Sequence, residues 1–254
     1  MIPLRDDIPS RTFPLINYVV IAICSLAFLF QVSAGKDGNL IVERFGMVPA
    51  RFSQPDVVPV IRQQVQVQDQ FGQVRSAVVE REVAAPTIPI WATVLTCMFL
   101  HGGWMHFLGN MWFLYVFGDN VEDRLGHVGF ALLYLGTGVL AGVAHFFSAP
   151  TSPIPTIGAS GAIAGVMGAY AWFYPHAKVQ AVLPLFIFIQ VFVVPAPLFL
   201  GFWFLMQTFS GLSSGATTGV AWWAHIGGFV AGAAVALVAG RTHFGHDAVS
   251  ERRF

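Results

Sequence analysis

Long apolar stretches limit most strongly what this chain can fold into. A helix needs about 20 apolar residues to cross a hydrocarbon core of ~30 Å. Only 10% of the 254 residues are charged and the formal net charge is zero, whereas soluble domains carry about 25% charged residues. This composition excludes a disordered chain, a nucleic-acid binder and most soluble classes. We predict an all-α membrane protein, in one domain over residues 1–254, whose six spans are Phe13–Val32, Met98–Asp119, Val128–Phe147, Gly158–Tyr174, Pro195–Leu212 and Ala221–Gly240.

The basic residues between the spans predict how the chain crosses the membrane. With six spans, the N-terminus, the loops after spans two and four, and the C-terminus share one side. The two short loops on the other side, Ser148–Ile157 and Ser213–Val220, contain no Lys or Arg. The positive-inside rule therefore places both termini in the cytoplasm, with 241–254 as a short tail and 33–89 as a long external loop. The basic residues on the cytoplasmic side are Arg5, Arg11, Arg124, Lys178, Arg241, Arg252 and Arg253.

Two segments outside the spans have patterns of their own. Within residues 53–85, apolar and polar residues alternate on both sides of Phe71-Gly72, which predicts a β-hairpin; the alternative is an irregular surface insertion. The apolar run Val179–Val194 contains Pro184 and Gln190. We interpret this run as a partly buried or interfacial loop, because a seventh span would place the basic C-terminus outside.

Four polar residues lie inside predicted spans, where such groups are costly and mark function by default. His106 and Asn110 belong to the second span, Ser160 to the fourth and His225 to the sixth. All three spans begin on the external side. We expect His106 about two turns into its helix, Ser160 in the first turn and His225 in the second, all within roughly 3–15 Å of one membrane face.

Glycines in the fourth and sixth spans allow these groups to meet. Gly161 follows Ser160 directly, and Gly228 and Gly232 lie three and seven residues after His225. Residues at this spacing share one face of a helix, and small residues on such a face allow two backbones to approach closely in lipid. A direct hydrogen bond between the Ser160 hydroxyl and the His225 imidazole is therefore feasible.

This set of side chains has the components of serine hydrolysis. A serine hydroxyl is a weak nucleophile until a base takes its proton, and His225 is the histidine positioned to do so. The free N–H groups at the start of the fourth helix, the Asn110 amide and the His106 ring could bind an oxyanion. No carboxylate lies at this depth in the spans, so we infer a Ser–His dyad. We find no CxxC, HExxH or P-loop pattern and predict neither metal nor cofactor.

Each of these residues also has a structural interpretation. A serine in an apolar helix commonly bonds a backbone carbonyl. A histidine can be a packing donor or a proton relay, and an asparagine can join two helices. The common depth, the order along the chain and the facing glycines together favour a catalytic site.

These motifs resemble the rhomboid family of intramembrane serine proteases. The second span carries His106 and Asn110 in an HxxxN pattern, and the fourth carries Gly158-Ala159-Ser160-Gly161, a GxSG pattern. The sixth reads AHIGGFVAG, beginning just before His225, and an ExRxG turn follows the second span with Glu122 and Arg124. The resemblance covers roughly residues 91–240. His101 is similar to an upstream histidine of the family, and we expect it to hydrogen-bond in the first loop or retain water.

The resemblance implies a six-helix bundle with the fourth helix at its centre and a water-filled cavity open to the outside. It implies Ser160 as nucleophile, His225 as base and an oxyanion hole that includes Asn110 and His106. The implied substrates are single-span membrane proteins, cut in or near the bilayer, and we expect a bacterial plasma membrane as the location. One departure is Ala164, where the family often has an aromatic residue four positions after the nucleophile, so the packing partner of His225 stays open.

Two other functions compete with proteolysis. The same cavity could hold or escort membrane helices without cutting them, in a non-catalytic rhomboid-like protein. A small transporter using His106 and His225 is less favoured, because the spans lack an intramembrane carboxylate and the chain lacks a clear inverted repeat.

Overall fold

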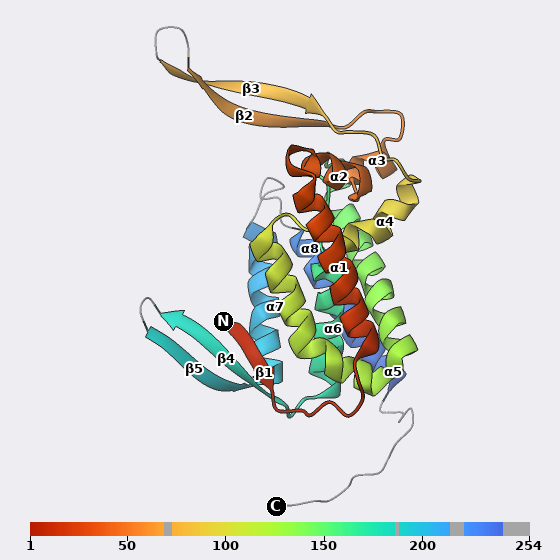
Figure 1. The fold of residues 1–254 in the computed structure, drawn as a ribbon, viewed down its shortest axis with the longest axis vertical. Coiled ribbons are helices and arrows are strands. Elements are labelled where there is room, and N and C mark those ends of the chain that lie inside the picture. The colour runs from red at the N-terminus through yellow and green to blue at the C-terminus, as the bar shows by residue number, and fades with distance from the viewer. Residues whose placement is uncertain (69–72, 186–187, 214–220, 241–254) are drawn as a thin grey trace, which may run out of the picture.

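A computed structural model describes residues 1–68, 73–185, 188–213 and 221–240. The expected tail 241–254 and most of the expected external loop before the last helix, residues 214–220, lie outside these ranges. Figure 1 shows a bundle of long helices, a two-stranded ribbon that projects from one end, and a three-stranded sheet beside the other half of the bundle.

Five helices form the bundle. Three are long and apolar enough to cross a membrane, namely α1, α5 and α8. Helix α5 covers both the second and the third expected spans. Gly126 (φ +71°) breaks the helical backbone between its two halves. Helices lie over all six expected stretches, and the number of membrane crossings stays a prediction. The bounds are Leu15–Ser33 for α1, Trp104–Ser148 for α5, Ser160–Phe173 for α6, Ala196–Ser213 for α7 and Trp222–Ala239 for α8.

The predicted start of the second span is wrong, and this error changes the depth of His106. The second span was expected to begin at Met98, but α5 begins at Trp104, because Gly103 (φ +153°) interrupts the helical backbone. His106 therefore lies in the first turn of α5. Helix α8 begins at Trp222, one residue after the predicted start, and His225 is its fourth residue. Short helical segments precede α5, with bounds Ile90–Ala92 (η2), Thr93–Thr96 (α4) and Cys97–Phe99 (η3).

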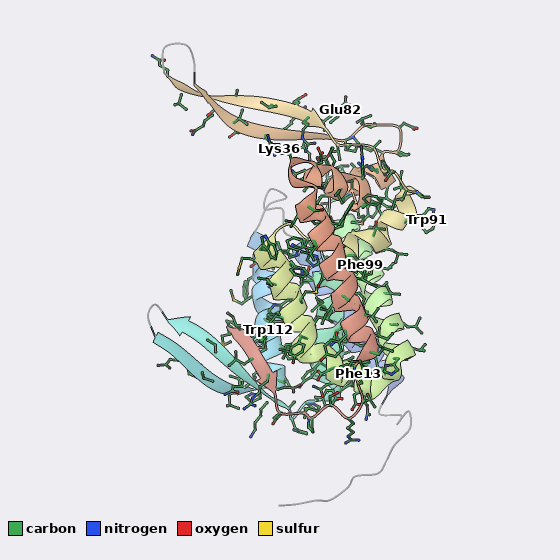
Figure 2. The ribbon with its side chains drawn as sticks, in the orientation of Figure 1. Phe13, Lys36, Glu82, Trp91, Phe99 and Trp112 are labelled. Atoms are coloured by element: carbon green, nitrogen blue, oxygen red, sulfur yellow. The ribbon has the colours of Figure 1, made fainter. Side chains whose placement is uncertain are left out.

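The expectation of an all-α protein is wrong in part. The run Val179–Val194 was predicted as a loop, but its described residues, 179–185 and 188–194, lie in strands β4 (Lys178–Leu185) and β5 (Phe188–Pro195), which pair antiparallel. Strand β1 (Ile2–Asp6) pairs with β4 and completes the sheet in the order β1-β4-β5. Alternation explains the strands: Val179 and Ala181 of β4 are fully buried on one face. Trp112 Nε1 of α5 donates to the Pro3 carbonyl of β1, which ties the sheet to the bundle (Figure 2).

Residues 33–89 fold into short helices and a ribbon. The helices are η1 (Gly35–Asp37), α2 (Gly38–Phe45) and α3 (Pro49–Ser53). Strands β2 (Val60–Gln68) and β3 (Val74–Glu82) then pair antiparallel, and the residues that join them lie outside the described ranges.

Helix α6 is the centre of the bundle. All residues from Gly161 to Tyr170 are buried, between α5 on one side and α8 on the other. A side chain on Gly228 would overlap the carbonyl of Gly161, and a side chain on Gly232 would overlap the carbonyl of Gly165. The backbones of α6 and α8 are thus in direct contact, and these glycines place the first turns of the two helices side by side.

The turn at the opposite end of the bundle holds α1 in place. The Glu122 carboxylate is fully buried and accepts the backbone N–H groups of Ile16 (2.8 Å) and Asn17 (2.7 Å), which belong to the first turn of α1. A carboxylate at a helix N-terminus satisfies free donors and complements the helix dipole. Arg124 lies over the Phe173 ring, 5.7 Å from its centroid. These contacts give the ExRxG turn a structural role.

Candidate active site

Ser160 and His225 form a hydrogen bond across the α6–α8 contact. His225 Nε2 lies 2.7 Å from Ser160 Oγ. Ser160 is the first residue of α6 and His225 the fourth of α8, so both side chains lie at the same end of the bundle. The close approach at Gly161 and Gly228 makes this short distance possible.

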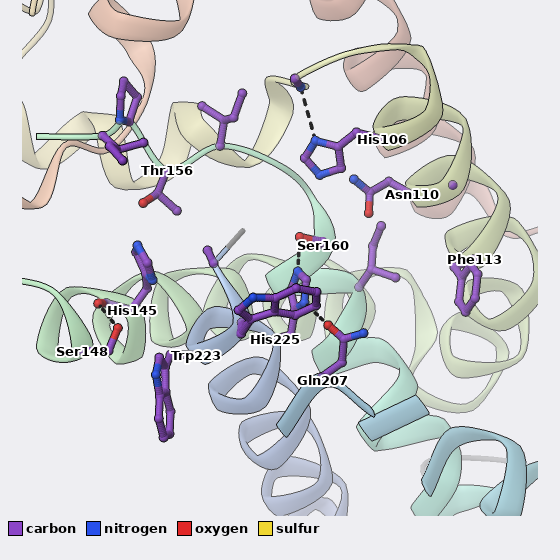
Figure 3. Close-up of a pocket in the computed structure, with 18 of the residues that line it drawn as sticks. His106, Asn110, Phe113, His145, Ser148, Thr156, Ser160, Gln207, Trp223 and His225 are labelled. Atoms are coloured by element: carbon purple, nitrogen blue, oxygen red, sulfur yellow. Dashed lines mark hydrogen bonds between the residues drawn. The ribbon is translucent and has the colours of Figure 1, made fainter. Parts of the chain in front are cut away.

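The second ring nitrogen of His225 also has a partner, which the sequence reasoning missed. His225 Nδ1 lies 2.6 Å from the Gln207 Oε1 atom of α7. An amide oxygen can only accept, so Nδ1 carries the proton and Nε2 is left as an acceptor for the Ser160 hydroxyl. Two hydrogen bonds therefore link side chains of α6, α8 and α7 in a row (Figure 3).

Two tryptophans pack around the His225 ring. The Trp203 ring of α7 is tilted against it with centroids 6.0 Å apart, and the Trp222 ring meets it edge-on at 6.0 Å. These two rings are the packing partners of His225 that the sequence had left open. Trp203 and Gln207 are four residues apart on α7, a spacing that places both on one helix face. A glutamine one turn after a tryptophan, in an otherwise apolar helix, was the signal available in the sequence.

The His106 ring lies beside the Ser160 hydroxyl. Its Nδ1 accepts the backbone N–H of Gly102 (3.2 Å), which leaves Nε2 as the donor. A methyl group on Gly158 would lie 2.8 Å from His106 Nε2 and 3.5 Å from Ser160 Oγ, so both atoms border the space over Gly158. Gly158 has φ +123°, a conformation that other residues rarely adopt.

Asn110 contributes an amide without a partner. It lies one turn beyond His106 on α5, and its Nδ2 atom is buried without a hydrogen-bond partner. Figure 3 shows the Asn110 side chain beside His106, on the side of the pocket that faces Ser160. A buried donor without a partner costs about 1–3 kcal/mol, so this amide is poised for an acceptor that a ligand would bring.

These groups share one cavity of about 760 Å³. Its wall includes His106, Asn110, Ser160, Gln207 and His225, and it contains no Asp, Glu, Lys or Arg side chain among the described residues. The cavity also has an unpredicted histidine in its wall, His145 near the end of α5, whose Nδ1 is buried without a partner.

His101 lies near the site but outside the lining of this cavity. Its backbone N–H and carbonyl each bond the Gln31 side chain of α1 at 3.1 Å. Its ring is buried, edge-on to Phe28 and Phe107 and 5.4 Å from the His106 ring centroid. The segment before α5 is thereby joined to α1. Among the described residues, no cluster of three or more His, Cys, Asp or Glu side chains could hold a metal ion.

Comparisons with known proteins identify the family. A family model described as the Rhomboid domain matches residues 89–242, which is more than half of the chain. The chain therefore belongs to the rhomboid family, as the motifs predicted. Rhomboid-like protein 11, chloroplastic, of Arabidopsis thaliana is 30% identical over 143 residues, 47% of this chain and 50% of that protein. Rhomboid protease GluP of Bacillus subtilis is 33% identical over 147 residues, 58% of this chain and 26% of that protein.

The family and the helices together define the class of protein. The putative rhomboid protease YdcA of Bacillus subtilis is 34% identical over 80 residues, which cover 32% of this chain and 40% of that protein. The chain thus spans half or less of the length of these relatives. Family membership and three helices apolar enough to span a bilayer make this an integral membrane protein. Membership of this family also supports an intramembrane protease function in general terms.

Proposed function

We propose that this chain is an intramembrane serine endopeptidase that hydrolyses peptide bonds in or near the transmembrane helices of other membrane proteins. The observation that carries the proposal is the 2.7 Å contact between Ser160 Oγ and His225 Nε2, in a cavity that also holds the unpartnered Asn110 amide. A nucleophile bonded to its base, beside free donors, is the arrangement that acyl transfer requires.

In the first half of the reaction, Ser160 Oγ attacks the carbonyl carbon of the scissile bond and its proton passes to His225 Nε2. The carbonyl oxygen becomes an oxyanion, which accepts hydrogen bonds from the Ser160 N–H, Asn110 Nδ2 and His106 Nε2. Removing one such donor costs about 10²–10³ in rate in a serine protease. The His225 proton then passes to the leaving nitrogen, the C–N bond breaks, and an ester on Ser160 remains.

In the second half, water replaces the leaving amine. His225 Nε2 takes a proton from the water while its oxygen attacks the ester carbon, and the same donors hold the second oxyanion. The Ser160–acyl bond breaks, the proton returns to Ser160 Oγ, and a carboxylic acid leaves. No metal or cofactor takes part in this sequence.

The substrate has to present an unwound segment to this cavity. A helix keeps its carbonyls in internal hydrogen bonds, so a transmembrane helix must open locally before Ser160 can reach one. The Ser160 end of the bundle carries segment 33–89, which we place outside the cell, with both termini in the cytoplasm of a bacterial plasma membrane. Cleavage then takes place in the outer part of the bilayer, within one rhomboid-like domain that spans residues 1–254.

Activity-based labelling tests this proposal. Purified protein in detergent is treated with a fluorophosphonate probe, and wild type is compared with Ser160→Ala and His225→Ala. We expect labelling of the wild type alone, because only a serine activated by its imidazole reacts with such a probe. If thermal melting shows that the protein is folded in all three samples and none of them is labelled, the proposal is contradicted and the non-catalytic helix binder is favoured.

A further inference from the structure

We propose that Gln207 is a positioning residue, which orients His225 as the third member of a hydrogen-bonded row with Ser160. The inference rests on the proposed protease function and deepens it. It adds to the Ser–His pair a group from a third helix, α7, that the sequence motifs do not include.

The geometry places Gln207 where an orienting group has to lie. Its Oε1 is 2.6 Å from Nδ1, the nitrogen of His225 that does not face Ser160, while Nε2 lies 2.7 Å from Ser160 Oγ. When His225 takes the serine proton, the ring becomes positively charged, and the amide oxygen stabilises that charge. With Oε1 facing Nδ1, the same bond disfavours the tautomer in which Nε2 carries the proton and cannot act as a base. In serine proteases that use a triad, the third residue has these two roles.

An amide suits this position better than a carboxylate. The cavity wall contains no Lys or Arg among the described residues, so a carboxylate here would have no cationic partner until His225 was protonated. An unpaired charge at membrane depth is costly. The neutral amide supplies the acceptor without that cost, which explains how a site without a carboxylate can still hold its histidine in one tautomer.

The other groups around His225 do not supply this acceptor. Trp203 and Trp222 contact the ring with their indole rings, and an indole nitrogen only donates. The other titratable side chains in the cavity wall are His106 and His145, both from α5. Among the described residues, Gln207 is the one side chain bonded to His225 Nδ1.

The location of Gln207 on α7 links the base to a helix that carries neither catalytic residue. Helix α7 follows β5 without a linker, and its outer side exposes Phe202, Leu205 and Met206. A displacement of α7 away from α8 would therefore break the bond to His225 without moving Ser160. The reactivity of the base depends on where α7 lies.

Three substitutions at Gln207 and one control on the same helix test the inference. Gln207→Leu keeps the size and removes the acceptor, Gln207→Ala removes both, and Gln207→Glu keeps an acceptor and adds charge. Met206→Leu changes a half-exposed side chain at the adjacent position and is the matched control. The measurements are the rate of fluorophosphonate labelling, and kcat and KM for cleavage of a membrane substrate, each as a function of pH.

We expect Gln207→Leu and Gln207→Ala to lower kcat and the labelling rate about 10- to 100-fold with little change in KM. This is the range for losing one hydrogen bond to a group that becomes charged in the transition state. Gln207→Glu should recover activity and move the acidic limb of the pH profile to higher pH, because a neighbouring carboxylate raises the pKa of an imidazole. Met206→Leu should behave as wild type.

The outcomes separate this inference from the proposed function. Wild-type kcat and an unchanged pH profile in Gln207→Leu would overturn the role of Gln207 and leave the protease intact. Loss of activity in Gln207→Leu without recovery or a pH shift in Gln207→Glu would make Gln207 a packing residue and also overturn the inference. If Gln207→Leu does not fold, the pH profile of Gln207→Glu decides whether Gln207 orients His225: a shift of the acidic limb to higher pH supports this role, and an unshifted limb overturns it. A wild-type protein that is not labelled by the fluorophosphonate and does not cleave the membrane substrate would overturn both proposals.

Discussion

The two ends of α6 carry polar groups of opposite character. At the Ser160 end, the groups border a cavity of about 760 Å³, and Asn110 Nδ2 has no partner. At the other end, the Tyr170 hydroxyl donates to the Asp6 carboxylate and the Tyr174 hydroxyl donates to the Asn120 carbonyl at 2.8 Å. Polar groups at one end of the helix border a cavity, and those at the other end join segments of the chain.

The end of α6 at Tyr170, which we call the closed end, shows what buried polar groups do when they hold a structure together. Glu122 receives two N–H donors from α1, and its neighbour Asp123 accepts both the N–H (2.9 Å) and the hydroxyl (2.7 Å) of Thr12. Buried polar groups are normally paired in this way, but the Asn17 side-chain amide at this end is also buried without a partner. The free Asn110 amide differs from that of Asn17 because it lies in the wall of the cavity, and this difference predicts that substitutions at the two ends affect different measurements.

The largest effect is expected at the Ser160 end, from Asn110→Ala. The variant should lose about 10²–10³ in kcat, because one oxyanion donor is missing from the transition state. Its melting temperature should stay near that of wild type, since Asn110 Nδ2 makes no hydrogen bond in the resting protein. The matched control is Asn120→Ala, a buried asparagine on the same helix at the closed end, which should cost stability and leave kcat unchanged. Equal kcat in the two variants would break the comparison.

At the closed end, Glu122→Ala should destabilise the fold by about 1.5–3 kcal/mol, the scale of hydrogen bonds to a charged group. The α1 donors at Ile16 and Asn17 lose their acceptor. Glu122→Gln keeps one acceptor oxygen and should fall between wild type and Glu122→Ala in denaturant or thermal unfolding in detergent. The labelling rate per folded molecule should match wild type in both variants. A slower rate in folded Glu122→Gln would show that the two ends are coupled.

The smallest effect concerns the β2–β3 ribbon. Buried Glu43 in α2 pairs with Arg81 of β3 at 2.5 Å and accepts the Ala84 N–H at 2.9 Å. Burial alone would raise the pKa of Glu43, but Arg81 and the Ala84 N–H outweigh it and lower this pKa. The depressed pKa means that the stabilisation is present above the ordinary value of about 4.3 and is lost as the pH falls through the pKa of the folded state.

Glu43→Gln should therefore loosen the root of the β2–β3 ribbon at neutral pH. We expect several-fold faster amide hydrogen exchange in β2 and β3 of the variant at pH 7, by mass spectrometry against wild type at the same pH. The difference should shrink as the pH falls through the lowered pKa of Glu43, because the wild-type carboxylate is then also protonated. Exchange in α6 should not change, and a change there would mean that the ribbon and the Ser160 end of the bundle share one unfolding unit.

The sequence predicted the contact between Ser160 and His225 better than the surroundings of these two residues. Local patterns placed Ser160 and His225 on helices with facing glycines, and the structure places their side chains 2.7 Å apart. The depth of His106 was wrong by more than a turn, because hydropathy alone does not locate the residue at which a helix begins, whereas the start of the helix that carries His225 was predicted to within one residue. The strands over Val179–Val194 were missed, since a short apolar run fits a strand, a loop or a buried helix equally well.

By itself, the sequence determined that the chain is a rhomboid-family membrane protein, because long apolar runs and short motifs are local features that need no knowledge of packing. Only the tertiary structure decided that Gln207 bonds His225, that Trp203 covers its ring and that Asn110 keeps a free donor. These contacts join residues from separate helices. Such contacts depend on how close the helices approach and how they are rotated about their axes, and the spacing of residues within one helix does not set either quantity.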